Sequence, residues 1–150
     1  MMYNNCLRRY RLLSGIVLYI KYKKVSETRR NHNVMEMDLQ IEVRRNGNYA
    51  ILDLVGEVDA YTAGRFREIM LNVIEEGHKD VIVCMQNVQY IDSSGLGALV
   101  GGLKRVSEKK GRIVIVCDNQ QVKKVFEITG LEKVFQIFAF EIDAIQAVSV

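Results

Sequence analysis

Two adjacent hydroxyl side chains, Ser93 and Ser94, are the residues of this sequence best placed to do chemistry. They follow Asp92 and precede Gly95, between an apolar strand pattern and an apolar helix pattern. Unpaired backbone N–H groups and the helix dipole favour negative charge where a helix begins. A hydroxyl at that position can bind beside an anion or carry a phosphoryl group. A purely structural interpretation is also open, in which Asp92 or Ser93 caps the helix and Ser94 fills its first turn.

Other kinds of site find little support in the sequence. It contains no Gly-x-x-x-x-Gly-Lys-Ser/Thr or Gly-x-Gly-x-x-Gly loop to cradle a phosphate, and no Gly-x-Ser-x-Gly elbow. His32 and His78 lack partners at the spacing of a catalytic triad or a metal site. The three cysteines are too few and too unevenly placed for a disulfide framework, which favours a reducing, cytoplasmic setting: Cys6, Cys84 and Cys117. The residues therefore support none of these enzyme classes and no structural zinc site.

The elements around these hydroxyls follow from the hydrophobic pattern. Alternating apolar residues predict strands over residues 39–43 and 49–55, and Asn46-Gly47 predicts a tight turn between them. Continuous apolar runs at residues 81–85 and 113–117 are typical of strands covered on both faces. The remaining pattern predicts helices through residues 66–74, 96–106, 122–129 and 142–148, and a last strand at 134–138.

This alternation predicts a single α/β domain with a mostly parallel central sheet of about five strands, an N-terminal antiparallel hairpin and about four helices. Sites in such sheets lie outside the carboxyl edge of the parallel strands, and the Ser93 segment leaves a strand at that edge. Asp59 is expected on a neighbouring loop, where it can also cap the next helix. Gly97, Gly101 and Gly102 weaken their helix intrinsically, so we expect them to permit a close approach by the sheet or by a bound protein.

Residues 1–34 differ in composition from the rest of the chain. They hold eight Lys or Arg against one Glu, a net charge of +7, which leaves −4 for residues 35–150 because the whole chain carries +3. Three interpretations stay open: a disordered basic arm, a membrane-surface anchor, or residues upstream of the natural start. The charges of residues 35–150 are mixed in sign, so we expect no direct contact with nucleic acid.

Several separated motifs carry a family resemblance. Asp92-Ser93-Ser94-Gly95-Leu96-Gly97, the stretch Gly56-Glu57-Val58-Asp59 with Thr62-Ala63, and the stretch from Val122 to Leu131 resemble, in order and spacing, the STAS domain of bacterial anti-sigma factor antagonists. The similarity covers about residues 37 to 150.

The resemblance implies a protein switch. In that family the unphosphorylated domain binds an anti-sigma factor that is also an ATP-dependent serine kinase, and this frees the sigma factor. The kinase then phosphorylates the first serine of the motif, here Ser93, and a metal-dependent phosphatase of the PP2C type reverses the reaction. ATP and magnesium belong to those partners. The resemblance implies a cytoplasmic protein, and nothing in the sequence demands more than a monomer.

The same resemblance sorts the other site residues. Ser93 is favoured over Ser94 as the phosphoacceptor, and Asp59 is expected to cap a helix or to position the serine and contact the kinase. The remaining positions are expected at the partner-binding surface: Tyr61, Thr62, Asp92, Ser94, Gly95, Leu96 and Gly97. Two alternatives share the fold, a non-switching STAS scaffold of a sensor complex or transporter, and a module that binds a nucleotide or another anion at the helix N-terminus.

Overall fold

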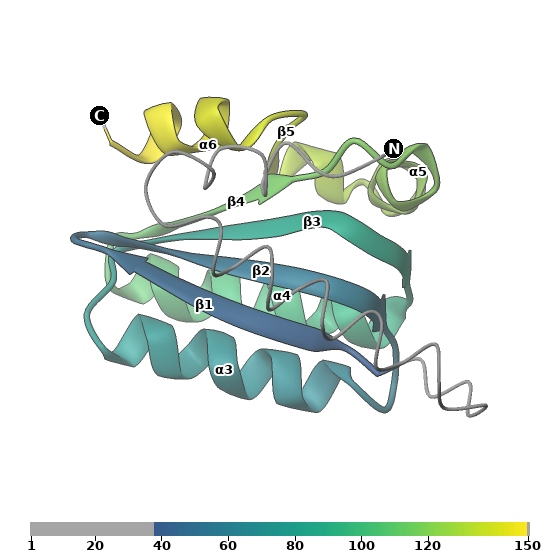
Figure 1. Ribbon diagram of the computed structural model, residues 1–150, viewed down its shortest axis with the longest axis horizontal. Helices are drawn as coiled ribbons and strands as arrows, with labels where there is room; N and C mark the ends of the chain where they lie inside the picture. Colours follow the sequence, from purple (N-terminus) through teal and green to yellow (C-terminus); the bar gives the residue numbers. More distant parts are fainter. Residues whose placement is uncertain (1–37, 150) are drawn as a thin grey trace, which may run out of the picture. The chain divides into compact units, whose positions relative to one another are not determined.

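A five-stranded sheet with two helices on each face makes up residues 38–149, the part of the chain that the computed structural model describes (Figure 1). The interpretations of residues 1–34 and the expected domain boundary at residue 35 lie outside the described residues. The elements are β1 (Gln40–Asn46), β2 (Tyr49–Val58), α3 (Ala63–Glu75), β3 (Asp80–Ile91), α4 (Ser93–Glu108), β4 (Arg112–Val116), α5 (Gln120–Thr129), the short 3₁₀ helix η2 (Leu131–Lys133), β5 (Gln136–Phe138) and α6 (Glu141–Val148).

The strands lie in the order β1-β2-β3-β4-β5, with β1 antiparallel to β2 and every other neighbouring pair parallel. The predicted hairpin is confirmed, because Asn46 pairs with Tyr49 and Gly47 has a φ of +54°, as a tight turn requires. Helices α3 and α4 pack on one face of the sheet, and α5 and α6 on the other (Figure 1). The carboxyl ends of β2, β3 and β4 therefore meet at one edge.

The core lies where the apolar pattern predicts it. The runs 81–85 and 113–117 are buried, and Phe66, Met70 and Ile74 of α3 are inaccessible to solvent. Leu96 and Leu99 of α4 are buried as well. Val100 falls within the apolar helix pattern predicted over residues 96–106 but is 42% exposed, so the buried face of α4 is narrower than its apolar pattern.

Strand β3 is longer than its apolar run indicates. The sequence predicts a strand that ends near Met85 and a short loop before the helix, whereas the structure continues the strand to Ile91. Polar residues interrupt the pattern there, yet β2 is extended to Val58 and keeps pairing with β3 through two register shifts. Backbone pairing with β2 thus overrides the side-chain pattern that predicted a loop.

The last strand is shorter than predicted. Residues 131–133 form η2, so β5 begins at Gln136, and Val134 is 53% exposed. No helix among the described residues is long and apolar enough to cross a membrane.

Candidate functional site

Ser93 is the first residue of α4 and is exposed. Asp92 caps this helix, because its Oδ1 accepts hydrogen bonds from the backbone N–H of Ser94 at 2.8 Å and of Gly95 at 3.1 Å. The predicted cap is therefore Asp92, and both serine side chains are released from that role. Ser94 is the second helical residue and is also exposed. Among the described residues, neither hydroxyl forms a hydrogen bond, so a partner protein can reach both.

The Asp59 loop lies beside this segment because β2 and β3 end together. Val58 pairs with Ile91, and the backbone N–H of Asp92 donates to the carbonyl of Val58 at 3.1 Å. Asp59 and Asp92 thus occupy equivalent places at the ends of adjacent parallel strands. The predicted neighbourhood of these two loops is confirmed.

Asp59 shapes its own loop and does not cap α3 directly. Helix α3 begins at Ala63, whereas the Oδ1 of Asp59 accepts from the backbone N–H of Tyr61 at 2.8 Å and of Thr62 at 3.0 Å. The Thr62 hydroxyl lies 2.9 Å from the carbonyl of Glu57 and 2.9 Å from the backbone N of Asp59. These bonds lock a turn before the helix, which corrects the predicted N-cap. They also leave Tyr61 95% exposed at the rim.

The glycines of α4 differ in what they permit. A Cβ on Gly95 would lie 2.7 Å from side-chain carbons of both Val58 and Ile91, so only glycine lets the first turn approach the sheet this closely. A Cβ on Gly102 would overlap the side chain of Met70 in α3. A Cβ on Gly97 would have no other atom within 4 Å, and this residue is exposed. Close packing within the fold explains Gly95 and Gly102, and Gly97 faces open space.

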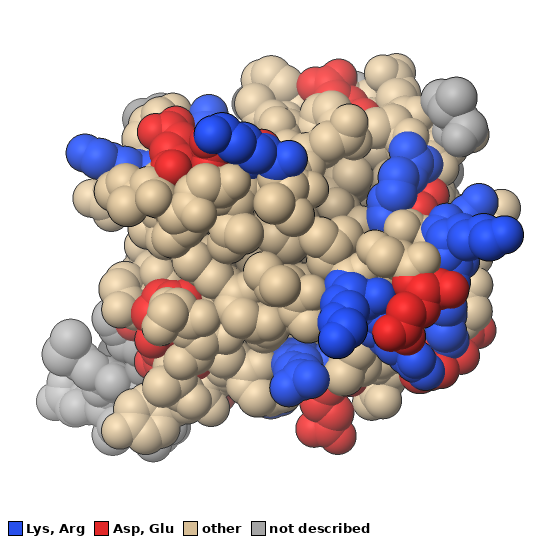
Figure 2. Space-filling view, turned by 180° about the vertical axis from the view of Figure 1, so that it is seen from behind, with Lys and Arg blue, Asp and Glu red and all other residues tan. Residues whose placement is uncertain are grey.

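The edge around Ser93 is acidic. The segments 57–62, 89–97 and 117–121, which follow or end the neighbouring strands β2, β3 and β4, contain four carboxylates and no Lys or Arg: Glu57, Asp59, Asp92 and Asp118. On the face drawn in Figure 2, most Lys and Arg side chains lie towards the right-hand end, and a smaller group of them lies beside acidic side chains at the upper left. A phosphate on Ser93 would therefore join an excess of negative charge.

Two exposed side chains near the site were missed by sequence reasoning. Tyr90, three residues before Ser93, pairs in register with Glu57 and is 48% exposed. Val100 lies on the outer side of α4, two turns into the helix. A single aromatic residue next to the buried Ile91 is a weak sequence signal, because aromatic residues are common in strands and often face the core.

Cys117 follows β4 at the same edge, and it is not a reactive thiol. Burial raises the pKa of its thiol to about 11. A hydrogen bond with the backbone of Asn119 lowers this pKa, but by less than burial raises it. At neutral pH almost none of it is thiolate, the form that acts as a nucleophile. Among residues 38–149, no activated cysteine therefore lies at this edge.

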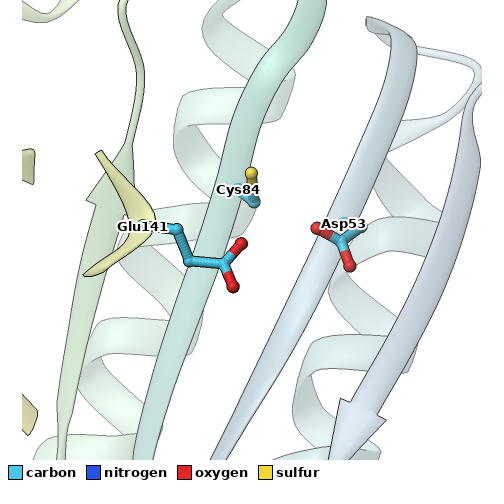
Figure 3. A group of neighbouring side chains, drawn as sticks. All are labelled: Asp53, Cys84 and Glu141. Carbon is cyan, nitrogen blue, oxygen red and sulfur yellow. The ribbon is translucent and has the colours of Figure 1, made fainter. Parts of the chain in front are cut away.

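A second group of chemically capable residues lies on the α5 and α6 face of the sheet, among strands β2 and β3 and helix α6. Side-chain atoms of Asp53, Cys84 and Glu141 lie within 4.8 Å of one another (Figure 3). The Cys84 sulfur is disulfide-bonded and is therefore no free thiolate ligand. The Arg44 guanidinium bridges the two carboxylates: it pairs with Asp53 and binds Glu141 through two contacts of 2.9 and 3.1 Å. This arginine supplies the positive charge that a cation would bring, so the group is an ion-pair cluster. Its members are distant in sequence, and no spacing rule finds them.

Comparisons with known proteins agree with this geometry. The family model of the STAS domain matches residues 40–144. An anti-sigma-B factor antagonist of Bacillus subtilis is 33% identical over 103 residues, which cover 69% of this chain and 94% of that protein.

Solved structures show the same fold. The unphosphorylated form of the anti-sigma factor antagonist SpoIIAA matches with a TM-score of 0.64 at 26% identity, over 74% of this chain and 96% of that one. An anti-sigma factor antagonist from Mycobacterium paratuberculosis matches with a TM-score of 0.70 at 20% identity, over 75% of this chain and 95% of that one.

Proposed function

Because this chain belongs to the STAS domain family, we propose that it is an anti-sigma factor antagonist whose unphosphorylated form binds an anti-sigma factor. The observation that carries the proposal is the exposed Ser93 at the start of α4, with Asp92 acting as the cap and the Asp59 loop beside it. Relatives and similar structures named as antagonists of this kind support it. The docking surface would include Ser94, Gly97, Tyr61 and Thr62. Gly95 and Leu96, which the sequence predicted there, are buried against the sheet instead.

Phosphorylation of Ser93 is the proposed switch. The anti-sigma factor would act as a serine kinase: the Ser93 Oγ forms a bond to the γ-phosphorus of ATP, the bond from that phosphorus to the bridging oxygen breaks, and the hydroxyl proton leaves to a base of the kinase. ADP departs with the magnesium that the kinase holds. A PP2C-type phosphatase would hydrolyse the phosphoserine. This chain would supply the acceptor and the docking surface and catalyse neither step, in the cytoplasm where those partners are.

The local charges explain how one phosphate can end binding without unfolding the domain. It adds about −1.5 to −2 charges, which the backbone N–H groups at the start of α4 can accommodate. Carboxylates of the same edge and close-packed partner atoms oppose it, at a cost of about 1 kcal/mol or more for each close like-charge pair. Each 1.4 kcal/mol changes an affinity about tenfold. A few such contacts are enough to release the partner.

The experiment that tests this function is phosphorylation by the cognate kinase. Wild-type protein with kinase and ATP should gain one phosphate at Ser93, read by peptide mass spectrometry. Ser93→Ala should abolish labelling, and the matched variant Ser94→Ala should retain it. Ser93→Asp should weaken binding to the anti-sigma factor by tenfold or more, which corresponds to a loss of about 1.4 kcal/mol or more of binding free energy.

Two results would contradict the proposal. Labelling that persists in Ser93→Ala would move the acceptor to another residue. Binding of the anti-sigma factor that is equal for wild type and Ser93→Asp would contradict the switch and favour the alternative of a non-switching STAS scaffold of a sensor complex or transporter, which shares the fold.

A further inference from the structure

Strand β3 continues past the end of its neighbour β4, and this extension leads to Ser93. The last pair between the two strands is Cys84 with Val116, whereas β3 runs on beside β2 to Ile91. Within residues 38–149, no strand therefore lies on the β4 side of residues 86–91. Val88 in this extension is fully buried, so its backbone carbonyl needs a partner from elsewhere.

A single side-chain amide provides that partner. Asn119 lies in the loop between β4 and α5, and its Nδ2 donates to the carbonyl of Val88 at 3.3 Å. Its Oδ1 accepts from the backbone N–H of Gln121 at 2.9 Å and of Val122 at 3.4 Å, which caps α5. One half of the amide thus holds the helix, and the other half holds the strand extension that β4 does not reach.

From this geometry we infer that Asn119 is a positioning residue for Ser93. Its amide replaces a strand neighbour at the level of Val88 and so holds the segment from which Ser93 leaves the sheet, five residues further on. The consequence for phosphorylation rests on the proposed function; the structural consequence does not. Capping of α5 alone would need only the oxygen of this side chain, whereas positioning needs the nitrogen.

Two substitutions separate these roles. Asn119→Asp and Asn119→Ser both keep an oxygen that can cap α5, since Asn, Asp and Ser are about equally good caps. Asp cannot donate to the Val88 carbonyl, and the serine side chain is too short to reach it. The control is Thr129→Val, which removes a hydroxyl that donates to the carbonyl of Val125 at 2.8 Å, at the far end of α5. It perturbs the same helix without touching the β3 extension.

The first measurement is hydrogen exchange of the full chain without any partner. The backbone amides of residues 89–92 should exchange about five times faster in Asn119→Asp and Asn119→Ser than in wild type, because a local opening is favoured when one bond is lost. Thr129→Val should leave these amides as they are in wild type. Equal exchange at residues 89–92 in all four proteins would overturn the inference, and so would an equal increase in the control.

The second measurement is the rate of Ser93 phosphorylation by the cognate kinase. We expect kcat/KM to fall about fivefold for both Asn119 variants, at a temperature where all proteins are folded, and to stay at the wild-type value for Thr129→Val. A loss shared equally by the control would assign the effect to α5 stability and refute positioning. If wild type itself gains no phosphate on Ser93, the proposed function fails, and the exchange experiment still decides the role of Asn119.

Discussion

Gly95 is the residue that lets the first turn of α4 lie against the ends of β2 and β3. It follows the two serines directly, and its missing side chain leaves room for Val58 and Ile91. The position of Ser93 therefore depends on a residue with no chemistry of its own. Gly97, two residues later, carries no such constraint and is open to solvent or to a partner.

The contrast between the two glycines predicts that an added methyl group affects stability in opposite ways at the two positions. Gly95→Ala should lower the free energy of unfolding by about 2 kcal/mol, because the added carbon overlaps two buried side chains. Gly97→Ala should leave the stability unchanged or raise it by up to about 1 kcal/mol, since alanine favours the helix. Urea denaturation of both variants checks this. Equal midpoints would show that the approach of α4 to the sheet is looser than the structure indicates.

At the scale of elements, the Arg44 cluster connects three parts of the fold. Arg44 lies on β1, Asp53 on β2 and Glu141 at the start of α6, and all three side chains are largely shielded from solvent. The guanidinium binds both carboxylates, so α6 is held to the hairpin by charge as well as by apolar contacts. A buried charge that loses one partner is costly, because water cannot replace it.

We therefore predict that Glu141→Gln destabilises the domain by about 3 kcal/mol. The matched control is Glu76→Gln, which breaks an ion pair with Arg45 whose members are 41% and 51% exposed, and which should leave the midpoint nearly unchanged. Thermal and urea denaturation report both. A Glu141→Gln protein as stable as wild type would mean that the cluster contributes little beyond its own desolvation.

At the scale of the whole molecule, the chain contains no proline. Refolding after prolonged unfolding should therefore lack the phase of tens to hundreds of seconds that prolyl isomerisation produces. Double-jump refolding under reducing conditions tests this, with unfolding times from seconds to an hour. A slow phase that grows with unfolding time and is accelerated by a prolyl isomerase would contradict the expectation.

The distribution of charge belongs to this scale too. The parallel strands bring the strand end with Glu57 and the segments with Asp59, Asp92 and Asp118 to one edge, although these residues are spread over 62 positions of the chain. The proposed switch depends on this cluster of carboxylates, because a single phosphate on Ser93 then adds to a region that is already acidic. No movement of the backbone is required for it to oppose a partner.

Much of the fold was predictable from the sequence because side-chain periodicity reports burial directly. The Asn46-Gly47 turn, the buried runs of β3 and β4, and the apolar face of α3 follow from local patterns and are confirmed. The extension of β3 was not predictable in this way. Polar residues interrupt its apolar pattern, and it exists because β2 continues beside it, which is a contact between distant parts of the chain.

The amino-acid sequence by itself determined that Ser93 stands between a buried strand and a helix, since apolar periodicity and capping residues are local properties. Only the tertiary structure decided what surrounds that serine. The role of Asp59 in its own turn, the space that Gly95 must leave empty and the bond from Asn119 to Val88 all join residues that are remote along the chain. Such contacts depend on how strands pair in space, and a single sequence carries no local signal for them.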